Sequence, residues 1–139
     1  MADVMVGVRS YLLSKTAITE LVGQRIYTDI MPQNATLPAI AFSKRTTRHE
    51  RTLSGFAGIA HCRLQFDCYA ATRIEANDIA EAIRSSGIIR VKGLTFGVNI
   101  RGARVEDGQR NEVEYSSEDS DDHRYVTSLD LEIDYSETE

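Results

Sequence analysis

The chain contains 139 residues, of which 42% are hydrophobic and 27% are charged, and its formal net charge is −5. These proportions are ordinary for a soluble globular protein, so whole-chain disorder and a fibrous repeat are excluded, and the length predicts one domain over residues 1–139. The acidic balance also disfavours a general basic surface that would grip nucleic acid.

The first third of the chain predicts two helices and a loop. Apolar residues recur at helical spacing from Asp3 to Leu13, which indicates an amphipathic helix. Thr16 is placed to cap a second, short helix that Gly23 would end. A brief extended piece is expected at 25–27, and two prolines and an asparagine predict a loop over 31–38.

The next segment predicts a long β-hairpin. Residues 39–49 begin apolar and become polar, as expected of a strand whose second half leaves the core, and the glycines near Phe56 indicate a turn over 51–58. We therefore expect a hairpin over about 44–58 that projects outward and carries side chains to a neighbouring subunit or partner, because arginine is enriched at interfaces. The candidate interface residues are Arg45, Arg48, Arg51, Leu53 and Phe56. An ordinary exposed hairpin is the alternative.

Residues 59–71 have a two-residue period that predicts a strand with one apolar and one polar face. Cys62 and Cys68 lie on the apolar face, separated by roughly 20 Å at ~3.3 Å per residue. This distance is too long for a disulfide, so we expect two buried free thiols.

The following segment begins with a capping box at Thr72–Glu75, which predicts a helix that extends to about Ser86 and ends at Gly87. A short strand is expected at 88–92 and another at 95–105, with a bulge or bend near Gly102 where the alternation loses its phase.

The C-terminal segment predicts a mobile acidic loop over about 107–123, because its carboxylates repel one another. The last strand is the clearest in the chain, with strict alternation from Tyr125 to Tyr135. Taken with the preceding elements, the pattern predicts an α+β fold with a mainly antiparallel sheet, two or three helices packed on one face and a projecting β-hairpin.

Motifs for catalysis, nucleotides or metals are not recognisable in the sequence. There is no phosphate-binding glycine loop and no G-x-S-x-G elbow, so we expect no cofactor and no catalytic residues. A triad assembled from distant residues leaves a small enzyme as an alternative function. The run Asp119–His123 fails as a calcium loop because Arg124 occupies the place of the turn glycine. The three histidines are scattered, so no metal site is predicted.

The sequence is also without an obvious membrane or export signal. Its apolar runs are a few residues long, far below the ~20 residues needed to cross a bilayer, and the N-terminal residues lack the features of a signal peptide. We therefore expect no membrane partner and synthesis in the cytoplasm.

Several segments together resemble one protein family. They are Leu21-Val22-Gly23, Arg25-Ile26-Tyr27, the loop from Met31 to Ile40, the strand from Leu64 to Ala70, the helix from Glu75 to Arg84 and the strand from Ser128 to Tyr135. In these segments the chain resembles the tail-completion proteins of long-tailed bacteriophages and gene transfer agents. The acidic stretch from Glu112 to Asp122 departs from the family pattern.

The resemblance implies a tail terminator or tail-to-head joining protein. Such a subunit forms a ring, commonly a hexamer, at the head-proximal end of the virion tail, after assembly in the host cytoplasm. Its partners would be the major tail tube protein and a head-completion or connector protein, and DNA would pass through its channel without specific binding. A head-completion or other neck protein is the nearest alternative.

The acidic loop has a candidate role in such a ring. The carboxylates in question are Glu118, Asp119, Asp121 and Asp122. Because a duplex carries about one negative charge per ~1.7 Å of axis, carboxylates that face a channel would repel passing DNA. A solubilising loop on the outer rim is the alternative.

Overall fold

The fold is described by a computed structural model for residues 4–32, 35–52, 55–88, 93–94, 99–115 and 123–136. Side chains are described for the same residues except 50–52, 55–57, 93, 94, 99, 105–109, 114, 115 and 123.

In this part of the chain six strands form one sheet, in the order β1-β2-β3-β6-β5-β4. Only β1 and β2 pair in parallel, and all other neighbours are antiparallel. The strands are β1 (Ile26–Thr28), β2 (Ala39–Thr52), β3 (Gly55–Ala70), β4 (Gly93–Leu94), β5 (Asn99–Tyr115) and β6 (His123–Ser136).

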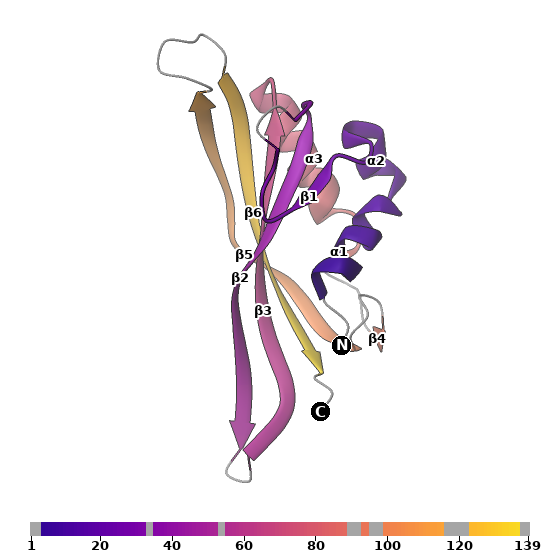
Figure 1. Ribbon diagram of the computed structural model, residues 1–139, viewed down its shortest axis with the longest axis vertical. Helices are drawn as coiled ribbons and strands as arrows, with labels where there is room; N and C mark the ends of the chain where they lie inside the picture. Colours follow the sequence, from indigo (N-terminus) through magenta and orange to yellow (C-terminus); the bar gives the residue numbers. More distant parts are fainter. Residues whose placement is uncertain are drawn as a thin grey trace.

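Three helices lie on one side of this sheet: α1 (Val4–Leu13), α2 (Thr16–Val22) and α3 (Arg73–Arg84) (Figure 1). Helix α3 packs directly on β3 and β6, and α2 packs on α3. Helix α1 is tied to the sheet because Arg9 Nε donates to the Ile26 carbonyl at 2.8 Å. The α+β fold class, with a mainly antiparallel sheet and helices on one face, is confirmed.

The core forms between the helices and the apolar face of β3. Every second residue of β3 from Ala60 to Ala70 is fully buried, as strand alternation requires. At its centre Phe42 of β2 stacks on Phe66 with 5.3 Å between ring centroids. Cys62 and Cys68 are free and buried in this face, as predicted.

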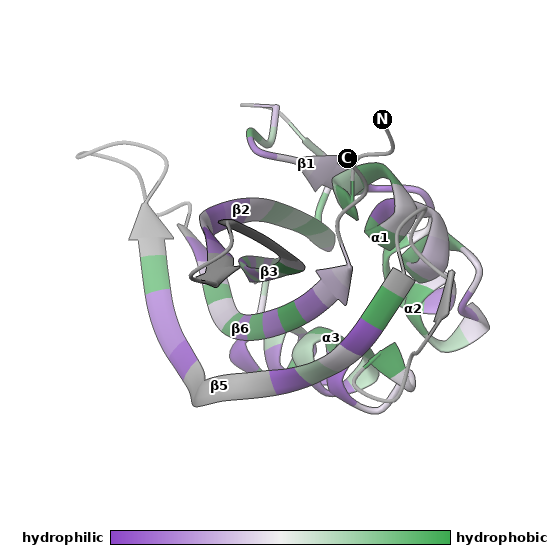
Figure 2. Ribbon diagram, turned by 90° about the horizontal axis from the view of Figure 1, so that it is seen from below, coloured by the Kyte–Doolittle hydropathy of each residue, from purple (hydrophilic) through white to green (hydrophobic). Residues whose placement is uncertain are grey.

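The two long hairpins have different shapes. Hairpin β2–β3 extends well beyond the helices at one end of the molecule, as expected (Figure 1). Strand β5 pairs with β6 but shifts register between Ile100 and Gly102, where the sequence predicted a bulge, and again between Glu106 and Gln109. The halves of β5 on either side of the second shift run in different directions (Figure 2), as expected where a bulge bends a strand.

Strand β5 corrects part of the acidic-loop prediction. Residues 107–115 belong to β5, and pairing with β6 resumes at Gln109 and continues to Tyr115 opposite His123, so the loop expected over 107–123 is shorter. Backbone pairing with β6 stabilises this part of β5 despite its acidic residues. Residues 116–122 lie outside the described part of the chain.

Two smaller boundaries also differ from the prediction. Thr16 is the first residue of α2, and the capping position is held by Lys15 without a side-chain hydrogen bond. The hairpin turn predicted over 51–58 is tighter, because β2 continues to Thr52 and β3 starts at Gly55. The cap of α3 agrees with the sequence, since the Thr72 hydroxyl accepts from the Glu75 amide at 3.2 Å.

Replacing Thr72→Ala should remove this cap and lower the free energy of unfolding by about 1 kcal/mol, measured by urea denaturation. Thr16→Ala is the matched control, because that threonine does not cap its helix, and its effect should stay below about 0.5 kcal/mol. Equal losses in the two variants would contradict the assignment of the caps.

Candidate interaction surfaces

The sheet face opposite the helices carries a row of paired charges, which we call the charge ladder. Its centre is β6, whose alternation places Asp130, Glu132 and Asp134 on this face. The registers bring polar residues of β3 to one side of these carboxylates and residues of β5 to the other. The ladder consists of His61, Arg63, Arg104, Arg110, Asp130, Glu132 and Asp134.

Asp130 is the most enclosed carboxylate of the ladder, with 9% of its side chain exposed. Arg110 donates to both of its oxygens, at 3.0 and 3.1 Å. From the other side, Arg63 Nη2 donates to Oδ2 at 3.1 Å. A paired, two-pronged guanidinium contact of this kind is among the stronger polar interactions in proteins.

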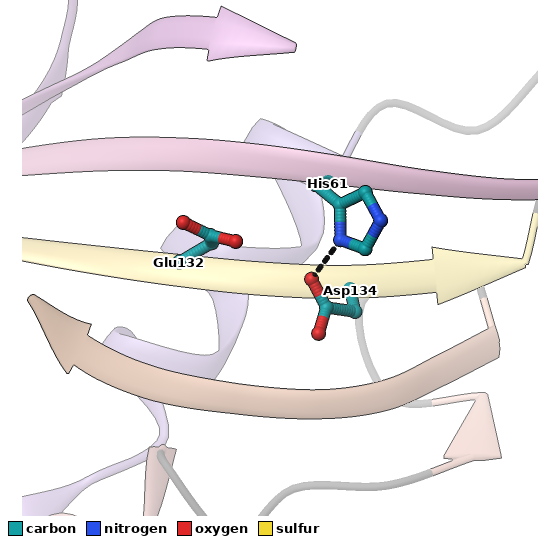
Figure 3. Close-up of side chains that lie close together, drawn as sticks. All are labelled: His61, Glu132 and Asp134. Atoms are coloured by element: carbon teal, nitrogen blue, oxygen red, sulfur yellow. Dashed lines mark hydrogen bonds and ion pairs between the residues drawn. The ribbon is translucent and has the colours of Figure 1, made fainter. Parts of the chain in front are cut away.

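Asp134 occupies a similar position four residues further along β6, beyond Glu132. Its Oδ1 lies 2.5 Å from His61 Nδ1 (Figure 3), and its Oδ2 accepts from Arg104 Nη1 at 3.0 Å. Arg104 Nη2 donates in turn to Glu132. One guanidinium therefore joins the two neighbouring carboxylates of β6.

The aspartates of the ladder are held in their charged form. Partial burial acts to raise the pKa of Asp130, but the hydrogen bonds and charges of Arg110 and Arg63 outweigh it, so the pKa lies below its ordinary value. At Asp134 burial is likewise outweighed, by His61 and Arg104, and that pKa is also lowered.

His61, Glu132 and Asp134 also have the composition of a metal site. One ligand atom from each lies within 4.8 Å of the others, and the sequence did not predict this grouping. Arg104 already donates to both carboxylates, so a cation would have to displace a guanidinium to bind. We interpret the group as part of the charge ladder.

Among the hairpin residues selected from the sequence, Arg48 borders the charge ladder. Arg45 and Arg48 are exposed. Arg48 lies opposite His61 in the β2–β3 register, whereas Arg45 lies at a register shift. Arg51 pairs with Phe56 in the same register, but their side chains lie outside the description, as does all of Leu53.

The four acidic residues predicted to face a channel are not placed by the structure. Glu118, Asp119, Asp121 and Asp122 lie outside the described residues. Their proposed role therefore rests on their charge alone.

Comparison with known proteins defines the class to which this chain belongs. Residues 6–86 match the family model of Tail completion protein gp17, a span that includes the helical layer and the β2–β3 hairpin. The chain therefore belongs to the family of Tail completion protein gp17. It is a structural protein of phage-type tails.

The same fold occurs in a solved virion structure. The chain matches a protein in the virion of a native gene transfer agent particle with a TM-score of 0.58, 16% sequence identity and coverage of 96% of this chain and 95% of that one. At this identity the likeness establishes the fold. No curated protein matches the sequence, and no helix among the described residues is long and apolar enough to span a membrane.

The charge ladder predicts a specific acid dependence of stability. Because its aspartates have lowered pKa values when folded, their contribution is present above the unfolded value of about 4 and is lost as the pH falls through the folded pKa. Asp130→Asn should lower the free energy of unfolding by about 1–3 kcal/mol at neutral pH. As the pH falls from about 5 to about 2, the variant should also lose less free energy of unfolding than the wild-type protein does.

Urea denaturation across this pH range measures both effects. Asp78→Asn, which removes an exposed carboxylate of α3, controls for the change in net charge. An Asp130→Asn variant with wild-type stability at neutral pH and a wild-type acid dependence would contradict the role of the ladder.

Proposed function

We propose that this protein forms a hexameric ring that closes the head-proximal end of a phage-type tail tube and joins it to the head connector. The observation that carries the proposal is the β2–β3 hairpin, which extends beyond the helices (Figure 1). It occurs in a chain that belongs to a tail completion family. Its exposed Arg45 and Arg48 supply the side-chain type that is enriched at protein interfaces.

A ring requires two different surfaces on each subunit, because only a head-to-tail contact repeats around a closed circle. The hairpin supplies one such surface on β2, at one edge of the long strands. The opposite side of the sheet, at β5, is chemically and geometrically different. This asymmetry favours a cyclic assembly over a symmetric dimer.

The proposed partners follow from this position. One face of the ring would contact the major tail tube protein, and the other would contact a head-completion or connector protein. Assembly takes place in the host cytoplasm, and the finished ring stays at the head-proximal end of the virion tail. The net charge of −5 is consistent with DNA that passes through the channel without being bound.

The test is assembly on purified tail tubes, imaged end-on by electron microscopy. Wild-type protein should cap tube ends as closed rings, whereas Arg45→Glu combined with Arg48→Glu should fold normally and fail to cap them. A matched control reverses Lys15 and Arg84, two cations of the helical layer, and should still assemble.

Two results would count against the proposal. Persistent binding of single copies to tube ends would contradict the ring, and normal capping by the hairpin variant would remove the hairpin from the interface. Labelled protein found only on tail-less heads would instead favour a head-completion or other neck protein.

We further propose that the acidic loop faces the channel or its mouth. Replacing Glu118, Asp119, Asp121 and Asp122 together with lysine should then slow DNA ejection from complete particles. The delay should grow at low salt. At 0.1 M salt the attraction between lysine and DNA is largely screened beyond about 10 Å, and at lower ionic strength it extends further. Fluorescence of released DNA measures the rate. Unchanged ejection with a normal particle yield would place the loop on the outer rim.

A further inference from the structure

The sheet has two long edges that the described part of the chain leaves without a partner strand. Strand β1 covers β2 only at Ile40–Phe42, so no described strand lies along the outer edge of β2 from Ser43 onward. Strand β4 covers β5 only at Asn99 and Ile100, so the same holds for β5 beyond Ile100 among the described residues. Such edges are templates for pairing with another chain.

We propose that the outer edge of β2 pairs with the outer edge of β5 of a second copy, so that the sheets of neighbouring subunits join around the ring. This inference rests on the proposed ring and specifies the contact that closes it. The contact is β-strand addition, in which backbone hydrogen bonds supply affinity and side chains supply specificity.

Strand direction permits this pairing without rearrangement. Each of the steps β2–β3, β3–β6 and β6–β5 is antiparallel, so β2 and β5 of one subunit run in opposite directions. Rotation about a ring axis that is inclined to the strands keeps these directions approximately and displaces the neighbouring sheet along the strands. A neighbour's β2 therefore meets β5 antiparallel, the arrangement that forms the stronger strand pair.

Charge also distinguishes the two edges. The free part of β2, residues 43–52, carries four basic side chains and one acidic side chain. The second half of β5, residues 106–115, carries four acidic side chains and one basic side chain. Its one arginine, Arg110, is paired with Asp130 inside the subunit. The free part of β2 and the second half of β5 are therefore complementary in charge to each other and not to themselves, which favours a second copy as the occupant. The registers within a subunit place Ser43 level with Glu106 and Arg48 level with Gly102, so these two segments meet when the neighbouring sheet is displaced along the strands.

The backbone of β2 identifies a position for a direct test. On the outer side of β2 the amide of Ile40 donates to the Arg25 carbonyl, and the carbonyl of Phe42 accepts from the Asp29 amide. The residues that alternate with these two face β3. The bulge between Lys44 and Thr46 inserts one residue, so the first amide beyond the bulge that faces outward is that of Thr47. Proline at this position removes an outward donor while sparing the bonds to β3, a placement that edge strands tolerate.

Thr47→Pro should therefore reduce tube capping at least tenfold, measured as capped ends per added protein, whereas the control Thr47→Val keeps the amide and should cap normally. Because proline can also disturb the strand, the variant's circular dichroism and unfolding midpoint are compared with those of wild type. Normal capping by a folded Thr47→Pro variant overturns edge pairing. Loss of capping in both variants also overturns edge pairing, because it assigns the effect to the threonine side chain.

Cross-linking tests the same contact without relying on proline. The native thiols are buried, and burial raises the pKa of Cys68 far above its ordinary value, so introduced cysteines are the reactive ones. Arg45→Cys protein is mixed with Arg101→Cys or Asn111→Cys protein, sites near the two ends of the free edge of β5. A short bismaleimide is then added both on tail tubes and in concentrated solution without tubes.

Covalent dimers that require both partners in the mixture support the pairing, and the more reactive β5 site reports its stagger. Dimers formed by either cysteine variant alone, or no β2–β5 product under both conditions, overturn it. The ring proposal fails separately: wild-type protein that never caps tubes contradicts it, whether or not edges cross-link in solution.

Discussion

Complete burial of one face of β3 is the constraint on which the remaining structure depends. Every second side chain from Ala60 to Ala70 is inaccessible to solvent, and the side chains between them are polar or charged. Shifting the pairing by one residue would turn Arg63 and its neighbours into the core, at a cost of several kcal/mol for each buried ion. The registers with β2 and β6 are fixed by this penalty.

The charge ladder follows from that register. Once the apolar faces of β3 and β6 are aligned, the carboxylates of β6 meet cations of β3 on the opposite face, and β5 adds Arg104 and Arg110 from the other side. Exposed ion pairs contribute little individually, but Asp130 is nearly enclosed and bonded by two arginines. The ladder therefore holds together three strands that the helices contact on the other face.

The sequence was sufficient where a local pattern determined structure. Alternation predicted β6 and the central part of β3, the hydroxyl of Thr72 predicted the cap of α3, and loss of phase predicted the bulge near Gly102. The full length of β5 was missed, because its acidic second half reads locally as a loop and becomes a strand through pairing with β6. The sequence alone could not predict the charge ladder. Arg63 and Asp130 are 67 positions apart, and only the register between β3 and β6 brings them together.

Charge on the two free edges bears on why such a subunit would form a ring and not a dimer. A symmetric dimer through residues 43–52 of β2 would place basic segments together, and one through residues 106–115 of β5 would place acidic segments together, so both are opposed by like-charge repulsion. Register shifts in both strands also twist and bend the edges, which makes nonspecific strand pairing harder. The contact that remains is the unlike one, between β2 and β5. Repetition of an unlike contact closes a circle when the rotation fits, so the features that protect the edges from aggregation are the same features that select cyclic assembly.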